Sequence, residues 1–172
     1  REVGLAVYDW PTSFGYNMFL LPVDQWLGKF GVFEEHSHRL LAAIVGFMTA
    51  SLAAWLWQNE TIGKARLIAL IGIVATLCLM AIRTKAMFVI MAVTAVLMIV
   101  CSAYKILKDC DRGAVRWWAT MAYGMVIVQG VLGGLRVTEQ NNQIGIIHGT
   151  LAQVFLIVLT LIALFSSNWW RK

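Results

Sequence analysis

Long apolar runs alternate with short polar segments along most of the chain. A bilayer core of roughly 30 Å is crossed by about 20 helical residues, because each residue of a helix rises about 1.5 Å. Both prolines precede the first long run, so no proline interrupts a span. The pattern predicts five transmembrane helices, over 38–58, 66–82, 86–107, 115–136 and 143–167.

The second and third runs form an unusual pair. The run over 66–82 is short, and only "RTK" separates it from the run over 86–107. Residues 66–107 are therefore interpreted as an inserted hairpin that crosses the membrane, or as a less regular insertion.

The composition agrees with a membrane protein, since 60% of the residues are hydrophobic and only 13% are charged. A lipid core offers backbone groups no hydrogen-bond partners, so each span has to be a helix. We therefore expect an all-α, integral-membrane helical bundle. Residues 1–35 form a loop outside the membrane, and residues 36–172 form the bundle.

Basic residues favour one orientation, with residues 1–35 on the non-cytoplasmic side of a bacterial-type inner membrane. The outer loop then carries a mixture of acids and bases. The inner side receives Lys64, Arg66, Lys105, Lys108, Arg112, Arg116, Arg171 and Lys172. The net charge of +5 is thus explained by topology, and a nucleic-acid partner has no support. Tryptophan pairs at 55 and 57, 117 and 118, and 169 and 170 mark the inner interface.

Two histidines are expected at matched depth. His38 lies at the outer end of the first span, and His148 lies about one turn into the last span, which also begins outside. Ionisable groups inside spans are costly and usually have a function. We expect the two imidazoles to face each other and to share a metal or cofactor. His36 points about 200° away from His38 around the helix, so it is expected at the interface instead.

Small side chains near both histidines favour a flat ligand. The residues are Ala42, Val45, Gly46, Thr49 and Ala53 in the first span, Gly145, Gly149 and Ala152 in the last, and Gly130, Gly133 and Gly134 in the fourth. Such stripes are either packing seams or room for a porphyrin with two axial histidines. The three cysteines lie away from both histidines and offer neither a zinc site nor a disulfide.

Charged residues beside the histidines have two interpretations each. Arg39 and Arg136 either extend to the interface or pair with heme propionates. Glu35, three residues before His38, either caps the helix or serves as an acid that accepts or holds a proton. Glu34 is expected to face solvent.

Four motifs in order, "GLAVYDWPTSFGYNMFLLP", "EEHSHRLLA", "VQGVLGGLRV" and "IIHGTLAQ", resemble the amino-terminal half of the heme A synthase family. The resemblance covers residues 4–57 and 115–156. It implies a four-helix core in which two histidines straddle a heme, and an enzyme that oxidises a methyl group of heme O to give heme A for cytochrome oxidase assembly.

The resemblance also implies site residues and partners. Glu35 falls on the acid and His38 on the histidine of the family's E-x-x-H-R motif, and His148 falls on the histidine of its fourth helix. Glu35 is then catalytic, and heme O or heme b is bound through its iron to both histidines. Further heme-binding residues are Arg39, Arg136, Gln129 and Gly133. Implied partners besides lipid are heme O synthase, an electron donor and a second copy of the chain.

The chain departs from the family pattern in several places. Residues 60–112 replace a brief loop, and the outer loop lacks the cysteine pair that many members carry near the D-W-P segment. The helix expected before residue 4 and the family's second half are missing, so we expect a dimer, a fragment or a divergent relative. Two alternatives to heme A synthesis stay open, namely a non-catalytic di-histidine cytochrome and a cofactor-free membrane assembly factor.

Overall fold

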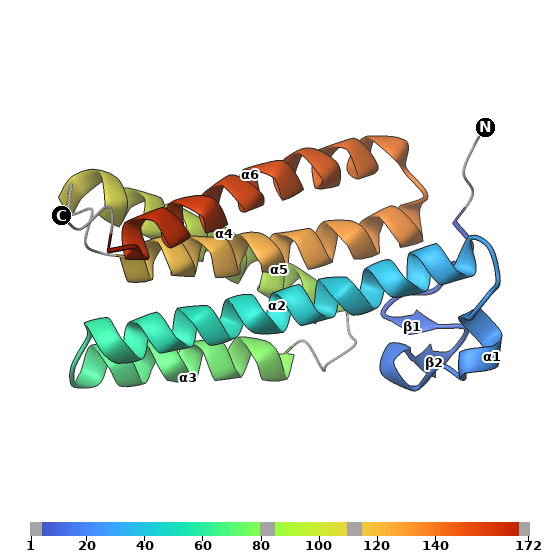
Figure 1. Cartoon of the computed structure of the whole chain (residues 1–172), viewed down its shortest axis with the longest axis horizontal. Coiled ribbons are helices and arrows are strands. Elements are labelled where there is room, and N and C mark those ends of the chain that lie inside the picture. The colour runs from blue at the N-terminus through green and yellow to red at the C-terminus, as the bar shows by residue number, and fades with distance from the viewer. Residues whose placement is uncertain (1–4, 80–84, 110–114, 169–172) are drawn as a thin grey trace.

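The computed structural model of the chain describes residues 5–79, 85–109 and 115–168 (Figure 1). As expected, these residues form an all-α helical bundle. Its long helices are α2 (Val32–Glu60), α3 (Lys64–Leu79), α4 (Lys85–Asp109), α5 (Val115–Glu139) and α6 (Asn142–Ser166).

Four of the helices, α2, α4, α5 and α6, are long and apolar enough to cross a membrane. The span expected over 66–82 corresponds to α3, whose 16 described residues do not reach that length. Residues 80–82 of that span lie outside the described part. Five spanning helices were predicted. In the described residues four helices are long enough to span a membrane, and α3 is shorter.

The first long helix begins earlier than the apolar run indicates. The Glu34 carboxylate accepts a 2.6 Å hydrogen bond from the Gly31 N–H, and Gly31 adopts a φ of 83°, which glycine tolerates without strain. Acidic side chains in this first turn also suit the positive end of the helix dipole. Glu35 and His38 therefore lie on one continuous helix. Glu34 is exposed, as expected.

A folded segment, residues 5–31, precedes α2 and is called the outer segment after its predicted side of the membrane. It contains a two-stranded hairpin, a 3-10 turn and one turn of helix. Their bounds are β1 Thr12–Ser13, β2 Tyr16–Asn17, η1 Met18–Leu20 and α1 Val23–Trp26. Asp9 holds the hairpin turn, because its carboxylate accepts hydrogen bonds of 2.8 and 2.9 Å from the N–H groups of Phe14 and Gly15.

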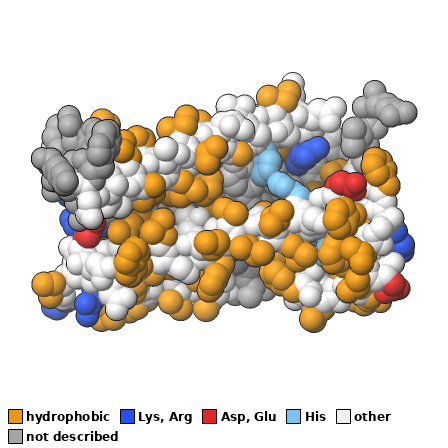
Figure 2. Space-filling model, in the orientation of Figure 1, with side chains coloured by type: hydrophobic (Ala, Val, Ile, Leu, Met, Phe, Trp, Pro, Cys, Tyr) orange, Lys and Arg blue, Asp and Glu red, His pale blue; other side chains and the backbone are white. Residues whose placement is uncertain are grey.

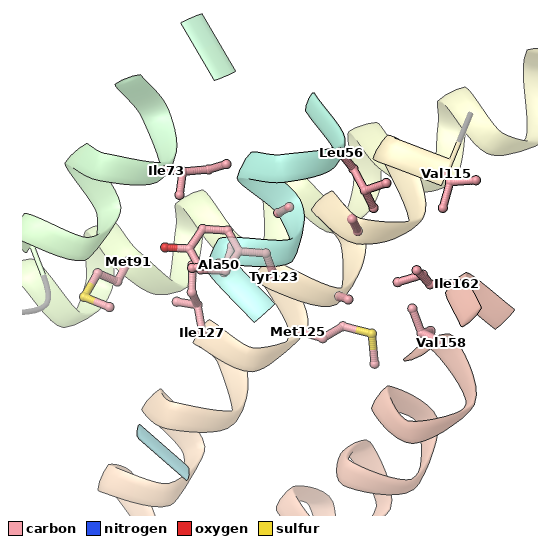
Figure 3. Close-up of a cluster of buried hydrophobic side chains, with 14 residues drawn as sticks. Ala50, Leu56, Ile73, Met91, Val115, Tyr123, Met125, Ile127, Val158 and Ile162 are labelled. Carbon is pink, nitrogen blue, oxygen red and sulfur yellow. The ribbon is translucent and has the colours of Figure 1, made fainter. Parts of the chain in front are cut away.

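The central helix of the bundle is α5, which packs against α2, α4 and α6. In its most apolar stretch 44% of residues are buried, against 17% in each of the other three spans. Tyr123 of α5 is fully buried in the core (Figure 3). Its hydroxyl shares a 2.8 Å hydrogen bond with Thr76 of α3. The core is therefore built around α5, while the outer faces of the other helices carry exposed apolar side chains that suit lipid.

Helices α3 and α4, expected to form an inserted hairpin, do not pack mainly on each other, as the two helices of a closed hairpin would. The helix α3 packs chiefly against α2, and α4 packs along α5 (Figure 1). Gly124 permits the close approach of α4, because a Cβ there would lie 2.9 Å from the Ala95 carbonyl oxygen. Helices α3 and α4 thus cover two different sides of the core.

Aromatic and charged contacts mark one end of the bundle. The Trp57 and Trp117 rings lie 5.1 Å apart, and Arg116 pairs with Glu60 at 3.6 Å. Residues of the outer segment contact the opposite ends of α2 and α5. This arrangement agrees with the alternating path expected from hydropathy, and the side of the membrane on which each end lies stays a prediction.

Candidate functional site

The structure brings His38 of α2 and His148 of α6 together. Their ring centroids are 6.3 Å apart and their planes are inclined by 77°. Both helices pack mainly on α5 rather than on each other. Figure 2 shows histidine side chains at the surface between α6 and α2, beside a basic side chain. The expected juxtaposition of the two imidazoles is therefore present.

The separation of the rings suits one metal ion between them. An imidazole nitrogen binds a metal at about 2 Å, so two nitrogens on opposite sides of one ion are about 4 Å apart. Adding the distance from nitrogen to ring centre on both sides brings the centroids to about 6 Å. The described residues contain no group of three or more His, Cys, Asp or Glu side chains that can hold a metal. Two ligands suit an iron that brings its other four donors in a porphyrin.

Helix α5 packs against His148. A Cβ added to Gly133 would lie 3.5 Å from His148 Cε1, whereas a Cβ on Gly130 would meet nothing within 4 Å. Gln129, on the preceding turn, donates a 3.1 Å hydrogen bond from Nε2 to the His148 carbonyl. Gln129 and Gly133, both expected to bind heme, therefore lie beside His148, and their contact with heme stays a prediction.

The stripe of small residues on α2 divides into two parts. Thr49 and Ala53 are buried in the core and form a packing seam. Nearer to His38, Ala42 and Val45 are exposed. The packing-seam interpretation therefore holds for Thr49 and Ala53, and room for a ligand near His38 stays a prediction.

Glu35 is held by three hydrogen bonds. Its Oε2 accepts from the N–H groups of Ala6 at 2.9 Å and Val7 at 3.1 Å, and its Oε1 accepts from Arg39 at 2.7 Å. The carboxylate therefore fastens the outer segment to α2, one helical turn from His38. Its predicted part in catalysis stays a prediction.

Arg39 fastens the same segment. It is 9% exposed, and its two terminal nitrogens donate to the backbone carbonyls of Val7, Asp9 and Thr12 at 2.7–2.9 Å. These contacts and the Glu35 ion pair occupy the donors that were expected to bind a propionate. Sequence reasoning missed this anchoring role, because the partners are backbone atoms some 30 positions away in the chain.

Arg136 is the better placed of the two arginines for an anionic group. Its side chain crosses Gly145 of α6, where an added Cβ would lie 3.2 Å from Arg136 Nε. It is exposed, and within the described residues it forms no ion pair. It also lies close enough to His148 to act on it electrostatically.

His36 does not share the face of His38, as expected, and it is buried beneath the outer segment; its position at the membrane interface stays a prediction. It is 1% exposed and packs against Trp26 of α1, with ring centroids 4.9 Å apart. The sequence does not reveal this contact, because it depends on how the outer segment folds over the start of α2.

Trp10 inserts into the outer end of the bundle, a contact that sequence reasoning missed. Its ring lies 4.7 Å from the ring of Phe88 on α4, and a Cβ on Gly134 of α5 would lie 2.5 Å from it. Gly134 therefore admits Trp10 and does not line the histidine pair. The glycine pair in "VLGGLRV" and the tryptophan of the D-W-P segment were the available signals.

Electrostatics also stabilise the outer segment. Burial of the Asp9 carboxyl raises its pKa, but hydrogen bonds from Gly15, Thr12 and Phe14 outweigh burial and hold the pKa below its ordinary value of 3.8. The hairpin turn is therefore held by an ionised carboxylate at neutral pH.

Other surface features lie away from the histidine pair. Cys78 and Cys101 are exposed, free thiols on α3 and α4, and Cys110 lies outside the described residues. An open apolar depression on α3, lined by Leu70, Ile71, Val74 and Ala75, contains no polar lining.

No protein-family model, curated protein or solved structure matches the chain.

Proposed function

We propose that this chain is a heme-binding membrane protein of the heme A synthase type, which oxidises a methyl group of heme O to the formyl group of heme A. The observation that carries the proposal is the 6.3 Å separation of the His38 and His148 rings, which would let both side chains hold one heme iron. The ordered motifs that resemble the family support the choice of reaction.

Each of the proposed residues has a separate role. His38 and His148 would hold the iron, Gly133 leaves space at the His148 ring, and the exposed Arg136 guanidinium would be available to a propionate. Glu35, oriented by its three hydrogen bonds, is the acid nearest in sequence to His38 on the same helix and is proposed to accept a proton from the reacting methyl group.

The chemistry requires a redox partner. Conversion of a methyl to a formyl group adds the oxygen atom of one water molecule and releases four protons and four electrons. A membrane quinone or dioxygen has to accept these electrons. When bound, heme iron supplies the redox centre through which they pass.

A di-histidine cytochrome is the second candidate, and two observations favour it. A heme held by both His38 and His148 would suit electron transfer better than the binding of oxygen. The Glu35 carboxylate is also engaged in anchoring the outer segment. In this alternative Glu35 is structural and the bound heme is not changed.

Heme binding is tested first, by the Soret absorbance of the purified chain. We expect His38→Ala and His148→Ala each to lose most of the bound heme, because each removes one iron ligand. His36→Gln is the matched control, since His36 faces Trp26, and it should keep its heme. A wild-type chain without a Soret band would leave only the assembly-factor alternative.

The reaction is tested by extracting the bound heme and identifying it by mass. Heme O, its hydroxylated product or heme A supports the synthase, whereas heme b alone favours the cytochrome. Glu35→Gln should keep heme and stop product formation, and Glu34→Gln is its control because Glu34 is exposed and only caps α2. Unchanged product yield in Glu35→Gln would remove Glu35 from the mechanism.

A further inference from the structure

A glutamine side chain is buried inside a membrane-spanning helix beside His148. Gln129 of α5 is only 9% exposed, and its Nε2 hydrogen-bonds the His148 carbonyl at 3.1 Å. A buried amide is costly in a low-dielectric interior unless both its donor and its acceptor are paired. The position of this side chain therefore needs an explanation beyond helix packing.

Two polar atoms of this residue pair lack partners. Gln129 Oε1 and His148 Nδ1 are both buried and, among the described residues, form no hydrogen bond. A Cβ on Gly133 would lie 3.5 Å from His148 Cε1 and 4.0 Å from Nδ1, so this edge of the ring faces α5. An unpaired acceptor on α5 thus accompanies an unpaired nitrogen that faces the same helix.

We propose that Gln129 is a positioning residue for His148, in which Oε1 accepts a hydrogen bond from Nδ1–H and leaves Nε2 for the iron. This inference rests on the proposed heme binding. Histidines that bind metals usually donate their second N–H to a protein acceptor, which selects the tautomer, orients the ring and makes the ligand more basic. Gln129 then uses both ends of its amide on one residue.

The inference predicts opposite effects of two substitutions on the reduction potential of bound heme. Gln129→Leu removes the acceptor, so His148 becomes a weaker electron donor, ferric iron is less stabilised and the potential rises. Gln129→Glu provides a stronger, charged acceptor of nearly the same shape, so the potential falls. Gln129→Leu should also weaken heme affinity by about 10-fold or more.

Tyr123→Phe is the matched control. It removes another buried hydrogen bond of α5, the 2.8 Å contact with Thr76, without touching His148. The full chain is purified in detergent with its heme, and the potential of wild type and the three variants is measured by spectroelectrochemical titration. We expect Tyr123→Phe to keep the wild-type potential, which separates the proposed role from general loosening of α5.

The outcomes distinguish this inference from the function on which it rests. Equal potentials in wild type, Gln129→Leu and Gln129→Glu, with heme bound in all three, would overturn the positioning role and leave heme binding intact. A shift of equal size in Tyr123→Phe would also overturn it. If Gln129→Leu does not fold, the direction of the shift in Gln129→Glu decides. A wild-type chain that binds no heme overturns the proposed function and this inference together.

Discussion

Three glycines of one short motif have three different surroundings. Gly130 has open space where a side chain would begin, Gly133 faces the His148 ring, and Gly134 faces Trp10. The physical difference is the direction in which each Cα points from α5, since successive residues are about 100° apart around a helix. A motif of small residues therefore combines an open position, a contact with the His148 ring and the packing site of Trp10.

Gly134→Ala is predicted to destabilise the protein by about 1–3 kcal/mol, because its Cβ would overlap the Trp10 ring and force the outer segment away. Unfolding in detergent measures the loss, and trypsin cleavage after the exposed Lys29 measures release of the segment. Gly72→Ala is the control, since a Cβ there meets nothing within 4 Å. If Gly134→Ala and Gly72→Ala were equally stable, the packing of Trp10 against Gly134 would be contradicted.

At the scale of elements, α2 presents different groups to different neighbours within two turns. Glu35 and Arg39 hold the outer segment, whereas His38 faces α6. Residues four apart share a helix face, and His38 lies about 60° from Glu35 and about 100° from Arg39 around the helix, so its ring reaches a different neighbour. Within one motif, the acid and the arginine therefore anchor the outer segment, and the histidine contacts His148 of α6.

Helix α3 is attached to the core by the Thr76–Tyr123 hydrogen bond as well as by apolar packing. In a double-mutant cycle of Tyr123→Phe and Thr76→Val, we expect a coupling free energy of about 0.6 kcal/mol, and no more than about 1.7 kcal/mol, as for other hydrogen bonds between membrane helices. Unfolding in mixed micelles provides the four free energies. Zero coupling would show that the 2.8 Å contact contributes nothing to docking of α3.

At the scale of the whole molecule, the two ends of the bundle differ in chemistry. One end carries the folded outer segment and the histidine pair, and the other carries the tryptophan pair and the Glu60–Arg116 ion pair. Basic residues at the second end favour its placement in the cytoplasm. The proposed heme site then lies near the non-cytoplasmic surface.

Cysteine labelling tests this orientation. In a chain whose native cysteines are replaced, we expect Lys29→Cys to react with an impermeant maleimide in intact cells. Lys64→Cys should react only after the membrane is permeabilised, because the turn before α3 is assigned to the inner side. The reverse labelling pattern would place the histidine pair near the cytoplasmic surface.

The amino-acid sequence by itself determined the fold class, the order of the helices and their approximate ends, because lipid imposes helices of known length and cannot solvate open backbone. It also determined that His38 and His148 lie at similar depth, since depth follows from counting residues along a helix. Only the tertiary structure decided what each side chain contacts around its helix. The Arg39 and Glu35 anchors, the Trp10 seat, the burial of His36 and the separate packing of α3 and α4 all depend on contacts between distant segments, about which hydropathy carries no information.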